Sequence, residues 1–184
     1  MQTASLDTPI GTLTIGATAR GLRLVQFPHE HHQPGVADAD AGDEAAVEAP
    51  SAATSTKPDR IAQAQLDEAV LQLTQYFDGT RTKFDIALDW YGVNGLRLTV
   101  LKLLAEVPFG ETVTYGDLAK GSGAGVTASQ AVGGIMGSNP LPIVVPCHRV
   151  LAADGLGGFG GGLRTKEWLL AWEGVMAPAL DWGL

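Results

Sequence analysis

The stretch TLTIGATARGLRLVQF, residues 12–27, decides the first half of the fold through its alternation of apolar and polar side chains. Leu13 and Ile15 are two residues apart, and a similar run follows the Gly-containing turn at residues 19–21. Because successive side chains of a strand point to opposite faces, this alternation is typical of a half-buried strand. We therefore predict two antiparallel strands within residues 1–28, which begin a small sheet.

A helix and a further strand are expected to complete this sheet domain. Apolar residues recur at helical spacing from Ile61 to Phe77, and Gly79 follows at the position where a left-handed helix cap is common. The alternating run Phe84, Ile86, Leu88 and Trp90 predicts the strand that completes the sheet.

Residues 29–59 differ sharply in composition from the flanking segments. They are rich in Ala, Asp, Glu, Pro, Ser and Thr, and they carry seven of the 20 acidic residues of the chain but one of its 12 basic residues. This composition predicts a flexible surface insertion. Three histidines at its start, His29, His31 and His32, would hold a metal only weakly without a cysteine or a further ligand, so a solvated loop is favoured and no metal site is expected.

The second half of the chain is predicted to be mostly helical. Helices are expected at residues 96–107, 114–119, 127–136 and 165–172. The second and third of these, joined by a Gly-containing turn, have the spacing of a helix-turn-helix. We predict an α+β fold, with a small N-terminal antiparallel sheet domain and its helix at residues 1–91 and a mostly helical domain at residues 92–184.

Composition limits the classes of function. The 184 residues are 45% hydrophobic and 17% charged, which fits a globular chain, and no apolar run reaches the length of a membrane span. With no signal peptide in the first residues, the sequence predicts a soluble, cytoplasmic protein with no membrane partner. The net charge of −8 argues against nucleic acid on its face, but outside residues 29–59 there are 13 acidic and 11 basic residues, a net charge of −2. Net charge therefore neither supports nor excludes nucleic acid as a partner.

The single cysteine, Cys147, excludes an internal disulfide and any multi-cysteine metal cage. It stands beside His148 and Arg149, and a neighbouring cation and imidazole are expected to lower the pKa of the thiol. Because adjacent side chains diverge, we expect a water to relay the proton between Cys147 and His148. Glu173, at the end of an apolar helix, is a candidate for the carboxylate that orients the imidazole, although a plain helix-end carboxylate fits that position equally well.

The sequence resembles the O6-alkylguanine-DNA alkyltransferase family over residues 96–174. The similarity lies in a series of short motifs in order, of which Pro-Cys-His-Arg-Val is highly specific. These are Val107-Pro108-Phe109-Gly110, Thr114-Tyr115-Gly116, Ala131-Val132-Gly133-Gly134, Ser138-Asn139-Pro140, Pro146-Cys147-His148-Arg149-Val150, Gly161-Gly162-Leu163, Lys166-Glu167-Trp168-Leu169-Leu170 and Glu173-Gly174. The first 90 residues fit the family's N-terminal sheet domain only in outline.

The resemblance implies single-turnover transfer of an alkyl group from O6 of guanine in double-stranded DNA to Cys147, without a cofactor and by a monomer. His148 and Glu173 would activate the thiol through a water. The Tyr115 hydroxyl would assist the departing guanine, unless this tyrosine only packs at a helix start. Asn139 would tie the second helix of the helix-turn-helix to the cysteine segment.

The same resemblance implies how DNA is held. The second helix would enter the minor groove, where the small residues Ala131, Gly133 and Gly134 allow close approach, and the damaged nucleotide would rotate out of the duplex. Backbone groups of Cys147 and Val150 and the amide near Gly160 would contact the flipped base. Six glycines among residues 155–162 suit close backbone approach to a ligand, although a mobile linker has the same composition.

The chain departs from the family pattern at Gln130, where an arginine that enters the duplex is usual. A glutamine is shorter and uncharged, so we expect weaker DNA affinity or slower base flipping with the chemistry intact. Another departure is Trp172, where histidine is common. The cations available for phosphate contacts are few, and a shallow salt dependence is expected. They are Arg97, Lys102, Lys120, Arg149 and Lys166.

Two other functions stay open at this stage. The first is a non-catalytic lesion-binding protein on the same scaffold, against which the presence of Cys147 counts. The second is an unrelated thiol hydrolase with a Cys-His-Glu relay, which would turn over repeatedly where an alkyl acceptor would stop after one reaction.

Overall fold

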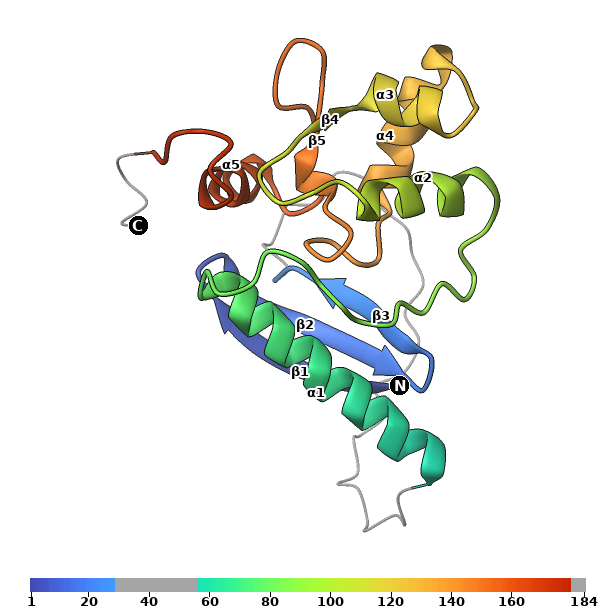
Figure 1. The fold of residues 1–184 in the computed structure, drawn as a ribbon, viewed down its shortest axis with the longest axis vertical. Coiled ribbons are helices and arrows are strands. Elements are labelled where there is room, and N and C mark those ends of the chain that lie inside the picture. Colours follow the sequence, from blue (N-terminus) through green and yellow to red (C-terminus); the bar gives the residue numbers. More distant parts are fainter. Residues whose placement is uncertain (29–55, 180–184) are drawn as a thin grey trace, which may run out of the picture.

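A computed structural model of the chain describes residues 1–28 and 56–179. The chain begins with a three-stranded antiparallel sheet in the order β1-β2-β3, where two strands were predicted (Figure 1). The strands are β1 (Gln2–Thr8), β2 (Gly11–Thr18) and β3 (Gly21–Gln26). The prediction was one strand short because the turns at residues 9–10 and 19–20 each take only two residues and leave room for a complete strand before, between and after them.

Helix α1 (Lys57–Phe77) packs on this sheet, mainly on β1 and β2 (Figure 1). It starts four residues before the predicted Ile61, because Thr56 caps it. The Thr56 hydroxyl accepts from the Asp59 amide, and the Asp59 carboxylate accepts from the Thr56 amide in return. Residues 57–59 therefore belong to the helix and not to the predicted insertion. The three histidines at positions 29, 31 and 32 lie outside the described residues.

The strand predicted at residues 84–90 is absent from the described part of the chain. Leu22 in β3 accepts from the Asp89 amide and donates to the carbonyl of Ala87, which makes one parallel bridge centred on Leu88. Further along β3, Val25 donates instead to the carbonyl of Pro140, 2.9 Å away. The edge of β3 is thus shared between two segments, and neither gains the repeated pairing that defines a strand.

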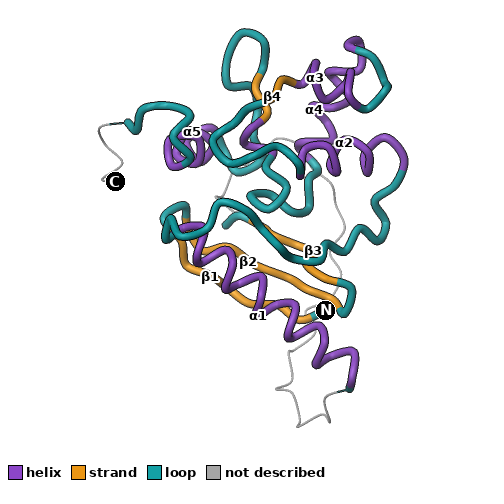
Figure 2. The backbone as a smooth tube through the Cα atoms, in the orientation of Figure 1, coloured by secondary structure: helices purple, strands orange, loops and turns teal. Residues whose placement is uncertain are grey.

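Helices joined by long loops are the main regular elements of the second half of the chain, as Figure 2 shows, and the α+β fold class is confirmed. The helix-turn-helix is present as two packed helices joined by a short helical turn. Two very short strands pair in parallel beside it, and neither was predicted. The elements are α2 (Gly95–Ala105), β4 (Val113–Thr114), α3 (Tyr115–Gly121), η1 (Val126–Ala128), α4 (Ser129–Gly137), η2 (Cys147–Arg149), β5 (Val150–Leu151) and α5 (Leu163–Trp172).

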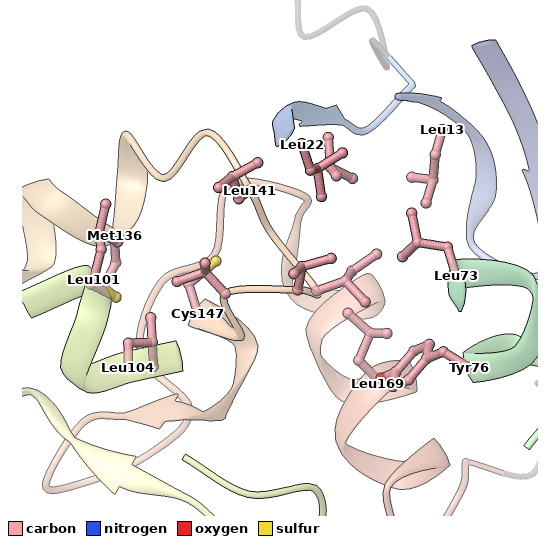
Figure 3. Packing of buried hydrophobic residues seen from close by; sticks show 14 of the residues in the cluster. Leu13, Leu22, Leu73, Tyr76, Leu101, Leu104, Met136, Leu141, Cys147 and Leu169 are labelled. Atoms are coloured by element: carbon pink, nitrogen blue, oxygen red, sulfur yellow. The ribbon is translucent and has the colours of Figure 1, made fainter. Parts of the chain in front are cut away.

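One buried apolar cluster runs through both halves of the molecule. It contains Leu13 and Leu22 from the sheet, Leu73 from α1 and Leu169 from α5. Figure 3 shows Cys147 within the same cluster. The thiol is therefore held where the packing of the two halves meets. Among the described residues, no helix has the length and apolar character needed to cross a bilayer.

Candidate active site

Cys147 opens the short helix η2 and is 5% exposed. Burial raises the pKa of its thiol to about 11, and the side chain of Asn139, the amides of Cys147 and His148 and the charge of Lys166 oppose that shift only in part. The expected lowering of this pKa was wrong, because the guanidinium of the neighbouring Arg149 is bound to a carboxylate and loss of hydration dominates. The structure therefore holds a neutral thiol at neutral pH.

His148 and Glu173 are in direct contact. Nε2 of His148 lies 2.8 Å from Oε1 of Glu173, and both side chains are fully buried. Hydrogen bonds from His148 and Arg149 outweigh burial and lower the pKa of the Glu173 carboxyl to about 2, while burial lowers the pKa of His148. A neutral imidazole facing a carboxylate must carry its proton on Nε2. Nδ1, which is buried without a hydrogen-bond partner in the described part of the chain, is then a free acceptor.

Two further side chains fix Glu173, and sequence reasoning assigned neither to it. Arg149 donates from Nε to Oε2 and from Nη2 to Oε1, both at 2.8 Å. The Tyr76 hydroxyl, from α1 in the first half of the chain, donates to Oε1 at 2.7 Å. Tyr76 is fully buried, and desolvation raises the pKa of its phenol well above the usual value, so it stays a donor. The carboxylate is therefore held by both halves of the molecule.

Asn139 connects the end of α4 to the cysteine segment. Its Nδ2 donates to the carbonyl of Val145 at 2.7 Å, and its Oδ1 accepts from the amide of Leu141 at 3.0 Å. Between these contacts Ile143 adopts a φ of 73°, an uncommon conformation for a β-branched residue. The asparagine thus closes a tight turn that leads directly to Cys147.

Tyr115 begins α3 and reaches the glycine-rich loop. Its hydroxyl donates to the carbonyl of Gly158 at 3.3 Å, and burial raises the pKa of the phenol, so it is protonated at neutral pH. Gly157 has a φ of 69°, and a Cβ there would lie 2.9 Å from the tyrosine ring. The glycine is needed for the loop to approach the ring this closely.

Two hollows meet at Tyr115. A cavity of about 360 Å³ is lined by Cys147, Tyr115, Gly133, Gly160 and four neighbouring residues. A surface groove of about 800 Å³ is lined by Tyr115, Gln130 and Gly133 of the helix-turn-helix and by Ala152, Ala153 and Gly158, which follow β5. Gln130, Ala131 and Gly134 are exposed on α4. Of the predicted DNA-contact residues of α4, Gln130 and Gly133 line the groove, and Gly133 also lines the cavity that contains the thiol.

Three predicted contact residues lie elsewhere. Lys166 is fully buried and donates from Nζ to the carbonyls of Val150, Leu156 and Gly158. Arg149 is 5% exposed and bound to Glu173, so neither cation is placed for a phosphate contact. Val150 is fully buried, and its carbonyl, which was expected to contact the base, accepts from Lys166.

The other three residues predicted for phosphate contacts differ in exposure. Lys102 and Lys120 are exposed, and Arg97 is half-buried and donates to the carbonyl of Ser138. Trp172 stacks on Trp168 with ring centroids 5.5 Å apart, and it donates to the carbonyl of Tyr76. Trp172 therefore affects the packing around the buried carboxylate of Glu173. Within residues 1–28 and 56–179, no group of three or more His, Cys, Asp or Glu side chains is arranged to hold a metal.

Comparisons with known proteins match both halves of the chain. Residues 96–175 match a family described as 6-O-methylguanine DNA methyltransferase, DNA binding domain, and residues 1–90 match the ribonuclease-like domain of the same enzyme. A methylated-DNA–protein-cysteine methyltransferase of Mycobacterium tuberculosis is 38% identical over 179 residues, 95% of this chain and 93% of the relative. One from Methanosarcina acetivorans is 35% identical over 175 residues, 95% of this chain and 99% of the relative.

A solved structure is similar over nearly the whole fold. The Mycobacterium tuberculosis OGT in complex with DNA superimposes with a TM-score of 0.71 and 33% sequence identity, covering 97% of this chain and 96% of that one. The match includes both the sheet and the helical half, so the likeness extends well beyond the cysteine motif.

Proposed function

The chain belongs to the 6-O-methylguanine DNA methyltransferase family, and from this we propose that it repairs DNA by moving an alkyl group from O6 of guanine to its own Cys147. The observation that carries the proposal is the position of the thiol. Cys147 borders a cavity that also contains Tyr115, and the adjacent His148 is fixed by Glu173. No cofactor takes part in the proposed reaction.

Activation of the thiol follows from the protonation states. The buried Cys147 is neutral until a base removes its proton, and Nδ1 of the next residue, His148, is an acceptor without a partner in the described part of the chain. We assign the transfer to a water between Sγ and Nδ1. The imidazolium that forms is stabilised by the Glu173 carboxylate at 2.8 Å.

The transfer step is a displacement at saturated carbon. The Cys147 thiolate forms the C–S bond while the C–O6 bond breaks and its electron pair leaves on the guanine. The protonated phenol of Tyr115 donates a hydrogen bond or its proton to the purine as this charge develops. A thioether has no easy route back to a thiol, so each molecule acts once.

The lesion must leave the duplex to reach this cavity. Rotating the nucleotide out of the duplex costs a few kcal/mol. Contacts between the protein and the space that the base leaves in the stack offset this cost. We propose that α4 enters the minor groove with its small residues Ala131, Gly133 and Gly134 against the backbone, and that Gln130 takes the space of the flipped base. Gly160 lines the cavity where the flipped base would lie.

Several finer points belong to the same proposal. The domain boundary between residues 91 and 92 is part of the proposal, and the two matched family regions, residues 1–90 and 96–175, support it. With Arg149 and Lys166 buried, phosphate contacts fall to Arg97, Lys102 and Lys120, and we expect fewer than about four released counterions in a salt titration. The monomeric state and the cytoplasmic location stay predictions.

A repair assay distinguishes this function from the alternatives. A duplex with one O6-methylguanine inside a restriction site is incubated in excess over the protein, and restored cleavage is counted. We expect the repaired amount to equal the amount of active protein and to be zero for Cys147→Ser. Repeated turnover would indicate a thiol hydrolase, and tight binding without repair would indicate a lesion-binding protein.

A further inference from the structure

The phenol of Tyr76 reaches from the N-terminal half to the buried carboxylate of the active site. Tyr76 is the penultimate residue of α1, and Figure 3 shows its ring extending from this helix toward α5. Its hydroxyl donates to Oε1 of Glu173 at 2.7 Å, and its carbonyl accepts from Nε1 of Trp172 at 3.2 Å. Two consecutive residues at the end of α5 thus bind the same tyrosine, although no step of the proposed reaction uses its hydroxyl.

Aromatic packing fixes the position of this hydroxyl. The centroid of the Tyr76 ring lies 5.1 Å from that of Phe77, 5.5 Å from that of Phe84 and 6.1 Å from that of Phe109. Tyr76 is fully buried, so solvent does not replace the carboxylate as its partner. Because these contacts involve the ring alone, a phenylalanine at this position keeps them and loses only the hydrogen bond to Glu173.

The hydroxyl shares its acceptor with the catalytic histidine. Besides Tyr76, Oε1 of Glu173 receives Nε2 of His148 and Nη2 of Arg149, both at 2.8 Å. Oε2 receives Nε of Arg149 at 2.8 Å and, more distantly, the amide of Gly110 at 3.4 Å. A carboxylate oxygen has two lone pairs, so the three donors at Oε1 compete for them. Each donor therefore weakens the attraction of Glu173 for the other two.

This competition bears on the proton affinity of His148. Apart from the adjacent Cys147, the charged and titratable groups that face the His148–Glu173 pair are Tyr76 from α1, Arg149 from η2 and Lys166 from α5. Burial lowers the pKa of His148, the charges of Arg149 and Lys166 lower it further, and Glu173 opposes them. A donor that occupies Oε1 reduces the contribution of Glu173 and favours the neutral imidazole.

We propose that Tyr76 is a positioning residue for alkyl transfer, through which the N-terminal half limits how strongly Glu173 binds the imidazole proton and so keeps His148 able to accept the proton of Cys147. The inference rests on the proposed function, because it concerns activation of the same thiol. Tyr76 does not touch the reacting atoms, and it acts through the oxygen that it shares with His148.

The kinetic test is the pH dependence of single-turnover methyl transfer from an O6-methylguanine duplex, from about pH 4.5 to about pH 8.5. Each profile is normalised to its own plateau, and urea unfolding shows that each variant is folded over this range. Tyr76→Phe is compared with two controls. Tyr91→Phe removes the hydroxyl of a tyrosine that is 68% exposed, and Val70→Ala loosens the packing of α1 without removing a hydrogen-bond donor.

We expect Tyr76→Phe to move the acid limb of the profile to higher pH by about half a unit or more, because the imidazolium gains a stronger partner. Well below the midpoint of the limb this makes the variant about threefold slower relative to its plateau. Replacing Tyr76 with 3-fluorotyrosine, a stronger donor, should move the limb to lower pH. The two controls should leave it in place, since loss of packing alone lowers stability without changing the proton affinity of His148.

Nuclear magnetic resonance of the histidine nitrogens gives a second measurement that needs no alkyl transfer. Replacing the three histidines at positions 29, 31 and 32 with glutamine leaves His148 as the single imidazole of the chain. Its titration should shift in the same direction as the kinetic limb in both Tyr76 variants. Titrations and normalised profiles that coincide with those of the wild-type chain would overturn the inference. A wild-type chain that transfers no methyl group would refute the proposed function, and the titration would still show whether Tyr76 acts on His148.

Discussion

Replacing Glu173 with glutamine tests the buried network that we assign to thiol activation. The carboxylate accepts hydrogen bonds from Tyr76, His148 and Arg149 at 2.7–2.8 Å. A glutamine of the same shape removes the negative charge and presents an NH2 group to side chains that are themselves donors. The change therefore leaves the Arg149 charge uncompensated and removes the group that keeps the His148 proton on Nε2.

The structure permits an estimate of both effects. Removing one partner of a buried ion pair costs about 3–5 kcal/mol of stability, and Glu173 is 4% exposed, so solvent cannot replace it. Loss of a correctly oriented general base typically slows a reaction by about 10²–10⁴-fold, or about 3–5 kcal/mol in the barrier. Glu173→Gln should thus be destabilised and slow, with its rate loss visible even in the molecules that stay folded.

The assay is single-turnover methyl transfer from an O6-methylguanine duplex at low temperature, paired with urea unfolding of the same preparation. Glu111→Gln is the matched control, because Glu111 is exposed and outside the network, and it should match the wild-type chain in both measurements. A folded Glu173→Gln protein that transfers methyl within about threefold of the wild-type rate would refute the assigned role of the carboxylate.

Three other predictions use the same structure. Gln130→Arg should tighten binding to a lesion duplex by about tenfold without changing the rate on free O6-benzylguanine, and an unchanged duplex preference would contradict the role given to this residue. Lys166→Met should lose about 1–3 kcal/mol in urea unfolding, because the buried carbonyl of Val150 and the part-buried carbonyl of Leu156 lose the donor that the lysine supplies; a variant as stable as the wild type would contradict this. The hydrogen bonds that Asp89 accepts from Arg20 and neighbouring groups hold its pKa at about 2, although burial opposes this shift. The ionised carboxylate therefore stabilises the folded state fully above about pH 4, and this stabilisation is lost as the pH falls toward 2. Asp89→Asn should therefore be less stable at pH 7 and converge with the wild type near pH 2, and a gap of equal size at both pH values would count against this assignment.

Elements with a strong internal pattern could be predicted from the sequence. The helical spacing of apolar residues located α1 and the helix-turn-helix, and the position of Glu173 at the end of an apolar helix made it a candidate partner for His148. Each of these depends on residues close together in the chain. Alternation at residues 84–90 was equally clear, but a strand also needs a partner along its length, and β3 offers it only one bridge.

The features that could not be predicted depend on contacts between distant residues. Tyr76 lies in the apolar stripe of α1 beside Phe77, so its sequence context is that of a core aromatic residue. Its bond to Glu173 joins positions 97 residues apart. Lys166 and Arg149 carry charges that are usually exposed, and only the folded chain shows the carbonyls and the carboxylate that compensate their burial.

Peptide mass spectrometry after exposure to an O6-methylguanine duplex tests the central claim most directly. We predict one added methyl group on the peptide that contains Cys147, in a yield equal to the fraction of active protein, with no modification elsewhere and no further lesion repaired afterwards. An unmodified Cys147 peptide from protein that has restored the guanine, or a methyl group on another residue, would contradict the account.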